Sequence, residues 1–158
     1  MRNPLSLLAR VIGQQTWMLK LAPAIIWTET RLHALFNGRI TLLGAAGLPS
    51  LRVTTTGRKS GLPRAVNLLY FPYQGNYVLT GSNWGRPAAP AWVFNLRANP
   101  VATIVVRGRE IAVKAREVDA EEYDEYWRLL LEFWPGYEME LREAGRRFAI
   151  FVLAKTTR

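Results

Sequence analysis

The stretch TTTGRKSGLPR, residues 54–64, gathers groups that can hold an anion. Its two glycines allow a tight turn with converging backbone amides, and Arg58, Lys59 and Arg64 place three cationic donors around that turn. A phosphate or a carboxylate is the natural ligand of such an arrangement. The spacing differs from a Walker P-loop, because Arg58 stands between the glycine and Lys59 and no helix is expected to follow. A solvated basic hairpin turn fits the charge equally well, but the clustering of donors with glycines favours binding.

A second candidate segment, residues 80–97, passes from a strand end through a polar loop with glycines into a short helix. Trp92 and Asn95 lie three residues apart on that helix and therefore share a face. An indole beside an amide can seat a planar heterocycle, because the indole packs near the ring and the amide hydrogen-bonds its polar edge. A buried core aromatic is the alternative for Trp92, and residue type alone favours that alternative.

A third segment, residues 127–145, carries aromatic residues on both sides of a Pro135-Gly136 break. Phe133, Trp134 and Tyr137 can form a wall that faces a substrate. Aromatic residues at a helix end more often belong to a core, so both interpretations stay open at this point.

The rarest residue types exclude several classes of chemistry. The absence of cysteine removes disulfides, thiolate nucleophiles, iron–sulfur clusters and cysteine-ligated zinc, and it fits a reducing compartment. His33 is the single histidine, so a histidine-based metal site or a Ser-His-Asp triad lacks its components and no metal site is expected. Any chemistry is therefore expected to be carried by something that the protein binds.

Short strands are the main elements expected to position these segments. Residues 4–36 are predicted to be helical with a break near Ala22-Pro23, because proline disfavours helical backbone in the residue before it. Two more helices are predicted at residues 89–98 and 120–133, the second with Asp119 as N-cap. Runs rich in β-branched and aromatic residues predict strands at residues 39–43, 51–56, 64–71, 77–82, 101–107, 110–117 and 148–154.

This pattern predicts a mainly β (α+β) fold, a barrel of six to seven mostly antiparallel strands with N-terminal helices and two or three short peripheral helices. The 158 residues fit a single domain, with a helical segment at residues 1–38 and a barrel at residues 39–158. Residues 1–109 hold 13 Lys or Arg and one acid, Glu29, for a net charge of +12, whereas residues 110–158 carry −3. An anionic partner is therefore expected, with nucleic acid, anionic lipid and a phosphorylated cofactor all still open.

The apolar N-terminal segment is too short between charges to span a membrane, since Arg10, Lys20 and Pro23 interrupt it. Trp17 and Trp27 with their apolar neighbours can instead form a helix at a membrane surface. Packing on the barrel or at a homodimer contact is the slightly favoured alternative. We expect a cytoplasmic location, with peripheral contact at the inner membrane surface left open.

Four motifs in order, TTTGRKSGLPR, NYVLTGSNWG, PAWVFNLRANP and FWPGYE, make the chain resemble a known family. This is the actinobacterial deazaflavin-dependent nitroreductase and quinone reductase family, which uses coenzyme F420, and the resemblance runs from about Leu51 to the C-terminus. It implies a split β-barrel related to FMN-binding proteins, with a two-electron donor seated in a groove on the barrel. The implied reaction is hydride transfer from reduced F420 to an electrophilic acceptor, with the cofactor supplying the reactive bond.

The resemblance also implies roles for individual residues. Those that match positions holding the cofactor's phosphate and acidic tail are Arg58, Lys59, Ser60 and Arg64. Those that match positions lining the deazaflavin ring and its linker are Thr80, Ser82, Asn83, Gly85, Trp92 and Asn95. The candidate catalytic residues, which would hydrogen-bond the acceptor, are Ser82 and Tyr137, and the candidate substrate-side residues are Trp84, Trp134 and Tyr137.

Two departures from the family pattern bear on the acceptor. Asn83, followed by the bulky Trp84, stands where nitroimidazole-reducing members have a lysine after the loop serine. Of three tyrosines that shape the substrate side in those members, only Tyr137 is kept, and Trp134 and Glu140 stand at the other two positions. A quinone or another conjugated carbonyl is therefore favoured as the small-molecule electron acceptor. FMN, or bound haem, in the same barrel is an alternative. A basic nucleic-acid-binding β-barrel is a further alternative, but it is not expected because aromatics and arginines do not alternate on a stacking strand.

Overall fold

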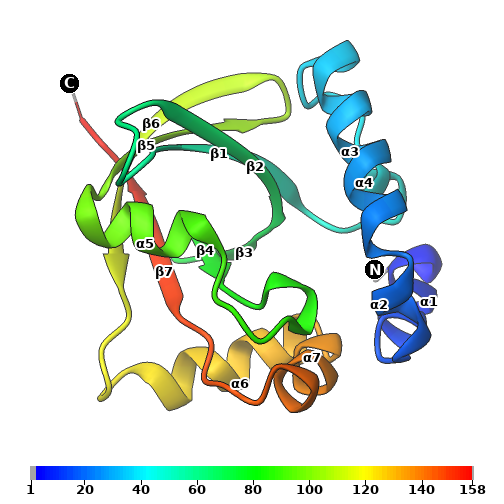
Figure 1. The fold of residues 1–158 in the computed structure, drawn as a ribbon. Helices are drawn as coiled ribbons and strands as arrows, with labels where there is room; N and C mark the ends of the chain where they lie inside the picture. Colours follow the sequence, from blue (N-terminus) through cyan, green and yellow to red (C-terminus); the bar gives the residue numbers. More distant parts are fainter. Residues whose placement is uncertain (1–2, 158) are drawn as a thin grey trace.

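The structure, a computed structural model, describes residues 3–157 (Figure 1). Its helices, in chain order, are α1 (Pro4–Ile12), α2 (Trp17–Lys20), α3 (Ala22–Phe36), α4 (Leu42–Ala45), the short helical turn η1 (Asn83–Gly85), α5 (Ala91–Ala98), α6 (Tyr123–Phe133) and α7 (Gly136–Ala144). Its strands are β1 (Ser50–Thr56), β2 (Pro63–Leu69), β3 (Phe71–Tyr73), β4 (Asn76–Thr80), β5 (Val101–Val106), β6 (Arg109–Glu117) and β7 (Ile150–Lys155).

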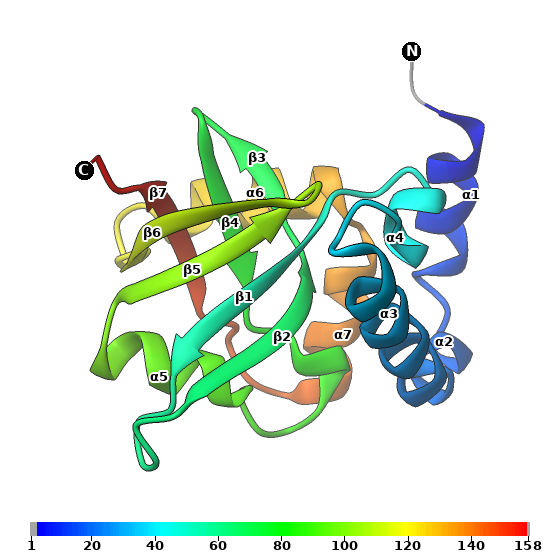
Figure 2. The same cartoon turned by 90° about the horizontal axis from the view of Figure 1, so that it is seen from above.

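All seven described strands pair antiparallel in one sheet, in the order β2-β1-β5-β6-β7-β4-β3. The sheet curls around its inner face, as Figure 2 shows, so the strands enclose a core as a half-barrel does. Side chains alternate along β1, where Leu51 and Val53 are fully buried inside and Arg52 lies on the outer face. The predicted fold class of a split, mainly antiparallel barrel is confirmed.

Two tight turns set the register of the barrel strands. Arg107-Gly108 joins β5 to β6, and Gln74-Gly75 joins β3 to β4. All four residues have positive φ, between 50° and 78°. Two-residue hairpin turns need this backbone conformation, because it gives the turn the same twist as the two strands that it joins. In both turns glycine takes the second position, where a positive φ costs no steric strain.

The predicted strand at residues 39–43 is wrong. Residues 42–45 form α4 instead, which begins at the N-cap Thr41, whose Oγ1 accepts a hydrogen bond from the Gly44 amide at 2.8 Å. The buried Glu29 carboxylate on α3 accepts a further hydrogen bond, from the Leu42 amide at 2.7 Å. The local composition of this segment fits a strand as well as a helix. The helical conformation is therefore determined by contacts such as that with Glu29, which is distant in the sequence.

The N-terminal helical region has a break that was not predicted, at residues 13–16 between α1 and α2. The predicted break near Ala22-Pro23 is confirmed, because α2 ends at Lys20 and α3 begins at Ala22 with Pro23 in its first turn. Proline is tolerated there because the amides of a first turn have no partner within the helix. The proposed division of the chain at residue 38 stays a prediction.

The N-terminal helices gather along one side of the half-barrel (Figure 1). Arg10 of α1 donates to the Glu132 carbonyl at 3.1 Å, and its guanidinium lies 5.7 Å from the centre of the Phe133 ring at the end of α6. Gly13 touches the Trp134 indole. The first helix thus packs against the end of α6, while α3 lies against β2. No helix within residues 3–157 has the length and apolar character needed to cross a membrane.

Replacing Gly13 by valine tests this contact. A side chain at Gly13 would overlap the Trp134 ring, so Gly13→Val is expected to lower the free energy of unfolding by about 1–3 kcal/mol. Urea unfolding followed by tryptophan fluorescence measures the loss. The exposed neighbour variant Gln14→Val is the control, with an expected change within about 0.5 kcal/mol. Equal stability of the two variants would mean that α1 does not rest on Trp134.

Candidate active site

A cavity of about 290 Å³ lies between the N-terminal helices and the barrel. Its walls come from α3, from β2, from the loop that follows β4, from the start of α5, and from the α6–α7 junction with α7. Ile25 and Ile26 of α3 and Leu68 of β2 are among the apolar residues that line this space. The volume fits a planar ring system, and the lining is mainly apolar with a few polar groups, as is typical of small-molecule sites.

Two buried polar atoms in the cavity wall have no hydrogen-bond partner among the described residues: Asn67 Oδ1 on β2 and Thr80 Oγ1 at the end of β4. Thr80 Oγ1 lies near the Tyr137 phenol, but outside ordinary hydrogen-bond geometry. An unpaired buried polar atom costs about 1–3 kcal/mol, so a ligand with polar edges would relieve this cost. A ring that carries N–H and C=O groups, such as a deazaflavin, fits that requirement.

The loop after β4 has a strained backbone. Asn83, Trp84 and Gly85 are consecutive left-handed residues, with φ of 51°, 56° and 72°. This region costs a non-glycine residue roughly 1–3 kcal/mol, and such strain is concentrated at functional sites. At Gly85 a Cβ atom would lie 3.1 Å from the Glu140 carbonyl oxygen, so glycine is needed here for close packing on α7 as well as for its φ. Asn83 and Trp84 both belong to the cavity wall.

Arg146 holds this loop in place. Its guanidinium donates four hydrogen bonds, at 3.0–3.3 Å, to the carbonyl oxygens of Gly81, Ser82, Arg86 and Ala88. The Ser82 and Ala88 carbonyl oxygens also accept from the Gly85 amide at 3.1 Å and from Asn83 Nδ2 at 2.9 Å, so Arg146 adds to hydrogen bonds that the loop makes within itself. Its guanidinium joins both ends of the loop through charge-assisted hydrogen bonds and thereby stabilises the loop conformation. Sequence reasoning missed Arg146, because an arginine among the charges of residues 142–147 carries no local sign of the contact.

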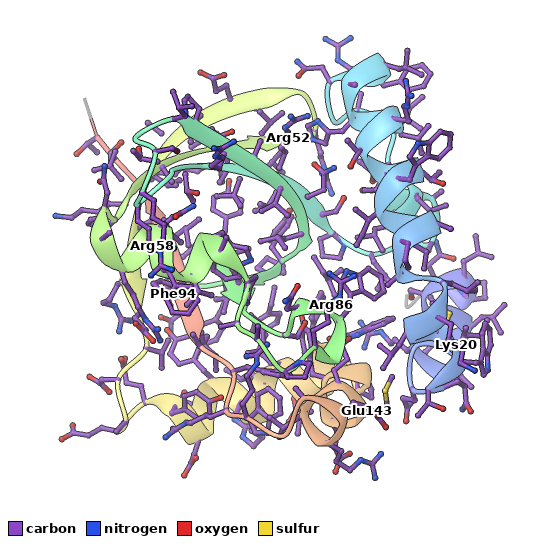
Figure 3. All side chains as sticks on the ribbon, viewed as in Figure 1. Lys20, Arg52, Arg58, Arg86, Phe94 and Glu143 are labelled. Carbon is purple, nitrogen blue, oxygen red and sulfur yellow. The ribbon has the colours of Figure 1, made fainter. Side chains whose placement is uncertain are left out.

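The basic turn between β1 and β2 has the predicted form. The Gly57 amide donates to the Leu62 carbonyl at 2.8 Å, and Ser60 Oγ accepts from Arg64 at 3.4 Å. The Arg58 guanidinium lies 4.5 Å from the centre of the Phe94 ring, and Figure 3 shows the two side chains together beside α5. Among residues 3–157, none of the ion pairs involves Arg58, Lys59 or Arg64, and all three are exposed to an incoming anion.

Asn95 supports the turn and does not line the cavity. Its amide nitrogen donates to Thr55 Oγ1 at 3.0 Å, and its amide oxygen accepts from the Arg58 backbone amide at 3.0 Å. Trp92 fits both of its interpretations, because it is only 4% exposed and packs edge-to-face on Phe151 while part of it reaches the cavity. The structure thus separates two residues that were predicted to share one ring-binding face.

The basic turn and the cavity are consecutive parts of one surface. Arg64 lies in β2 at the turn, and the next residues of that strand, Ala65 to Leu69, form a wall of the cavity. The predicted residues that line the cavity are Thr80, Ser82, Asn83, Trp84, Trp92, Trp134 and Tyr137. Those at the turn are Arg58, Lys59, Ser60 and Arg64. A ligand with a planar ring and an anionic extension matches this layout.

Several cavity residues were not predicted as site residues. They are Ile25, Ile26 and Glu29 of α3, Arg52 of β1, Asn67 of β2 and Glu140 of α7. An acid within the buried face of a helix is a detectable signal, and Glu140 follows Tyr137 by three residues on such a face of α7. The α3 residues carry no comparable signal, because only the tertiary fold brings them to the barrel.

Glu140 is a buried carboxyl in the cavity wall, 7% exposed. Burial raises its pKa to about 6, while hydrogen bonds with Ser82 and Trp134 act in the opposite direction. Burial also raises the pKa of the neighbouring Tyr137 phenol well above its usual range, and the Glu140 charge adds to that rise. The acid of this pair that can change its charge near neutral pH is therefore Glu140.

This pKa shift predicts a pH-dependent stability. The native pKa of Glu140, about 6, exceeds the ordinary value of 4.5. Its contribution to the free energy of unfolding is therefore full below about pH 4.5 and is lost as the pH rises through 6. The free energy of unfolding falls by about 2 kcal/mol over this range. In urea unfolding at a series of pH values, Glu140→Gln is expected to remove this decline. The exposed Glu138→Gln should retain it, and curves for Glu140→Gln that parallel the wild type would contradict the assignment.

A wider depression of about 1260 Å³ lies between the linker after α3 and the barrel strands. Its cations are Arg39, Arg107, Arg109 and Lys155. None of the predicted site residues lines it, and it lacks the unpaired buried polar atoms of the smaller cavity. The smaller cavity is therefore the candidate site.

Comparison with known proteins agrees with this geometry. The sequence model of one family, F420H(2)-dependent quinone reductase, matches residues 27–155. A relative described as an F420H(2)-dependent quinone reductase from Mycobacterium tuberculosis is 35% identical over 98 residues, as is a putative one from Mycobacterium bovis. The match covers 61% of this chain and 66% of each relative, just under two thirds of their length.

Solved structures give the same result. A protein described as an F420-H2 dependent reductase (FDR-A) superposes with a TM-score of 0.60 at 33% identity, over 67% of this chain and 94% of its own. Another, described as a domain-swapped dimer, gives a TM-score of 0.61 at 31% identity, over 84% of this chain and 99% of its own. The family model spans most of the chain, so the resemblance inferred from the motifs is confirmed. The chain belongs to the F420H(2)-dependent quinone reductase family.

Proposed function

We propose that the chain binds coenzyme F420 and transfers a hydride from its reduced form to a quinone or another conjugated carbonyl. The observation that carries this proposal is the single surface that joins an exposed cationic turn to a cavity with two unpaired polar atoms. F420 has a flat ring and a negatively charged tail, which are the two features that this surface accommodates. The implied family activity agrees with this chemistry.

When bound, the cofactor supplies the hydride. Arg58, Lys59 and Arg64 hold its anionic tail, and Asn67 and Thr80 hydrogen-bond the polar edges of its ring. The apolar side chains of α3 exclude water from the ring, which strengthens the polar interactions inside the cavity. Ser82 and Tyr137 line the cavity. In this proposal they hydrogen-bond the acceptor oxygen, where charge develops during reduction.

Fluorescence titration tests cofactor binding. Saturable quenching of F420 fluorescence at micromolar cofactor is expected, and oxidation of reduced F420 should then depend on an added quinone. FMN is the competing ligand, and protein that purifies with a bound flavin spectrum would assign the site to FMN. The absence of any saturable change with F420 would overturn the proposal.

The N-terminal helices support a further proposal about partners. Their outer surface exposes large apolar side chains, which are Leu5, Leu8, Val11, Trp17, Leu21 and Trp27. Large apolar side chains beside basic residues such as Lys20 suit contact with an anionic membrane surface, from which a lipid-soluble acceptor can reach the cavity.

Flotation with vesicles of anionic phospholipid tests this contact. The wild-type protein is expected to float with the vesicles, and the double variant Trp17→Ser/Trp27→Ser is expected not to. Light scattering that gives twice the chain mass without vesicles would instead assign this surface to a homodimer.

A further inference from the structure

We infer that Glu140 donates the proton that completes reduction of the acceptor. This inference rests on the proposed reductase function. Its basis is the place of the carboxyl group, which is buried in the cavity wall beside both candidate acceptor-binding residues, Ser82 and Tyr137. Hydride transfer to a carbonyl acceptor produces an oxyanion, and a buried oxyanion needs a proton source in the same cavity.

The surroundings of Glu140 favour a proton donor over a structural carboxylate. No ion pair among residues 3–157 includes Glu140, so no cation holds it permanently charged. Its hydrogen-bond partners are Ser82 on the loop and Trp134 at the α6–α7 junction. Neither of these is a cation, so a protonated carboxyl stays compatible with its contacts.

The other charged or titratable groups near this cavity are few. Tyr137 lies on the same helix, and Glu29 of α3 and Arg52 of β1 belong to other walls of the cavity. Arg146 is occupied by the loop carbonyls that it holds. Burial raises the pKa of Tyr137 far above neutrality, so its phenol is a poor acid here. Glu140, with a pKa of about 6, is the better-matched donor, because proton transfer is most efficient when the pKa of the acid lies near the working pH.

The step balances as a two-electron, two-proton reduction. The bound cofactor would supply a hydride to the conjugated system of the acceptor, which would leave negative charge on a carbonyl oxygen of the acceptor. The O–H bond of the Glu140 carboxylic acid breaks, a new O–H bond forms on that oxygen, and Glu140 becomes a carboxylate. Solvent reprotonates Glu140 before the next turnover and takes up the one proton that reduced F420 would lose together with the hydride.

Glu140→Gln tests this role, because glutamine keeps the size and hydrogen-bonding capacity of the side chain but cannot donate a proton at neutral pH. With a quinone acceptor, kcat is expected to fall by at least about 100-fold. The KM for the quinone and the Kd for F420 should stay within about threefold. Glu138→Gln, on the exposed face of the same helix, is the matched control and should keep the wild-type kcat.

The pH profile gives a second test that does not need the variant to fold. Wild-type kcat should fall tenfold per pH unit above about 6, or above a higher value if the bound acceptor buries Glu140 further. Infrared difference spectra of the wild type should show a protonated buried carboxyl that titrates in the same range and that Glu140→Gln lacks. Unchanged kcat in a folded Glu140→Gln variant, or a wild-type kcat independent of pH in this range, would overturn the inference.

The two hypotheses fail in different ways. If the wild type neither binds F420 nor oxidises its reduced form, the reductase proposal is wrong. If it does both, and Glu140→Gln does both as fast, then the reductase proposal stands and only the proton-donor role is wrong.

Discussion

Removing the charges of the β1–β2 turn is expected to weaken F420 binding by at least about 100-fold. The change is Arg58→Gln/Lys59→Gln/Arg64→Gln. Each cation contributes about 1–2 kcal/mol to an anion through a charge-assisted hydrogen bond, after allowance for solvent exposure. A loss of about 3 kcal/mol in total corresponds to more than 100-fold in Kd. Titration of F420 fluorescence measures the change, and the salt dependence of Kd should also become weaker.

The second depression offers a matched control. Arg107→Gln/Arg109→Gln/Lys155→Gln removes the same number of positive charges from a different surface. It therefore changes the net charge and the long-range electrostatic potential of the protein, but no side chain of the β1–β2 turn. Its Kd for F420 is expected to stay within about threefold of the wild type. Equal losses in the two triple variants would show that net charge alone attracts the cofactor. No loss in either would place the anionic tail elsewhere.

Replacing Arg146 is expected to lower both the stability of the protein and its quinone reductase activity. Arg146→Ala removes hydrogen bonds to four carbonyl oxygens, those of Gly81, Ser82, Arg86 and Ala88, two of which are part-buried. The free energy of unfolding is expected to fall by about 2–4 kcal/mol, measured by urea titration. The strained residues Asn83 and Trp84 should then relax, because strain persists only where surrounding contacts hold it. Quinone reduction is expected to fall at least tenfold in kcat/KM.

Arg146→Lys separates charge from geometry. Lysine keeps the charge but cannot present the fork of donors that spans several carbonyls, so an intermediate loss is expected. Arg142→Ala, an exposed change on α7, should leave both stability and turnover close to wild type. Wild-type turnover in a folded Arg146→Ala variant would show that the loop holds its shape without this contact.

The strands of the barrel could largely be predicted from local sequence. The predicted strands at residues 101–107 and 110–117 correspond to β5 and β6 within about one residue at each end. Alternating β-branched residues and the Arg107-Gly108 turn specify this hairpin without outside help. The segment at residues 39–43 behaves differently, because the Glu29 carboxylate and the Thr41 cap determine its backbone.

The candidate site also has parts that could be predicted from local sequence and parts that could not. The basic turn could be predicted because its glycines and cations are contiguous in the sequence. Asn67, Arg146 and the walls from α3 could not, since the chain must fold before they meet the loop after β4. Helical spacing predicts the face that Asn95 shares with Trp92, but it does not predict the hydrogen bonds of its amide with Thr55 and the Arg58 backbone.

The position of α3 couples events at the cavity to events at the outer surface of the protein. Ile25 and Ile26 contribute to the cavity wall, while Trp27 and Leu35 of the same helix are exposed. If contact with α3 strengthens the binding of a ligand in the cavity, then the bound ligand stabilises the position of α3 on the barrel by the same free energy, because the coupling between two equilibria is reciprocal. A surface that draws α3 away would therefore act as a negative effector of cofactor binding, and one that holds α3 in place would act as a positive effector.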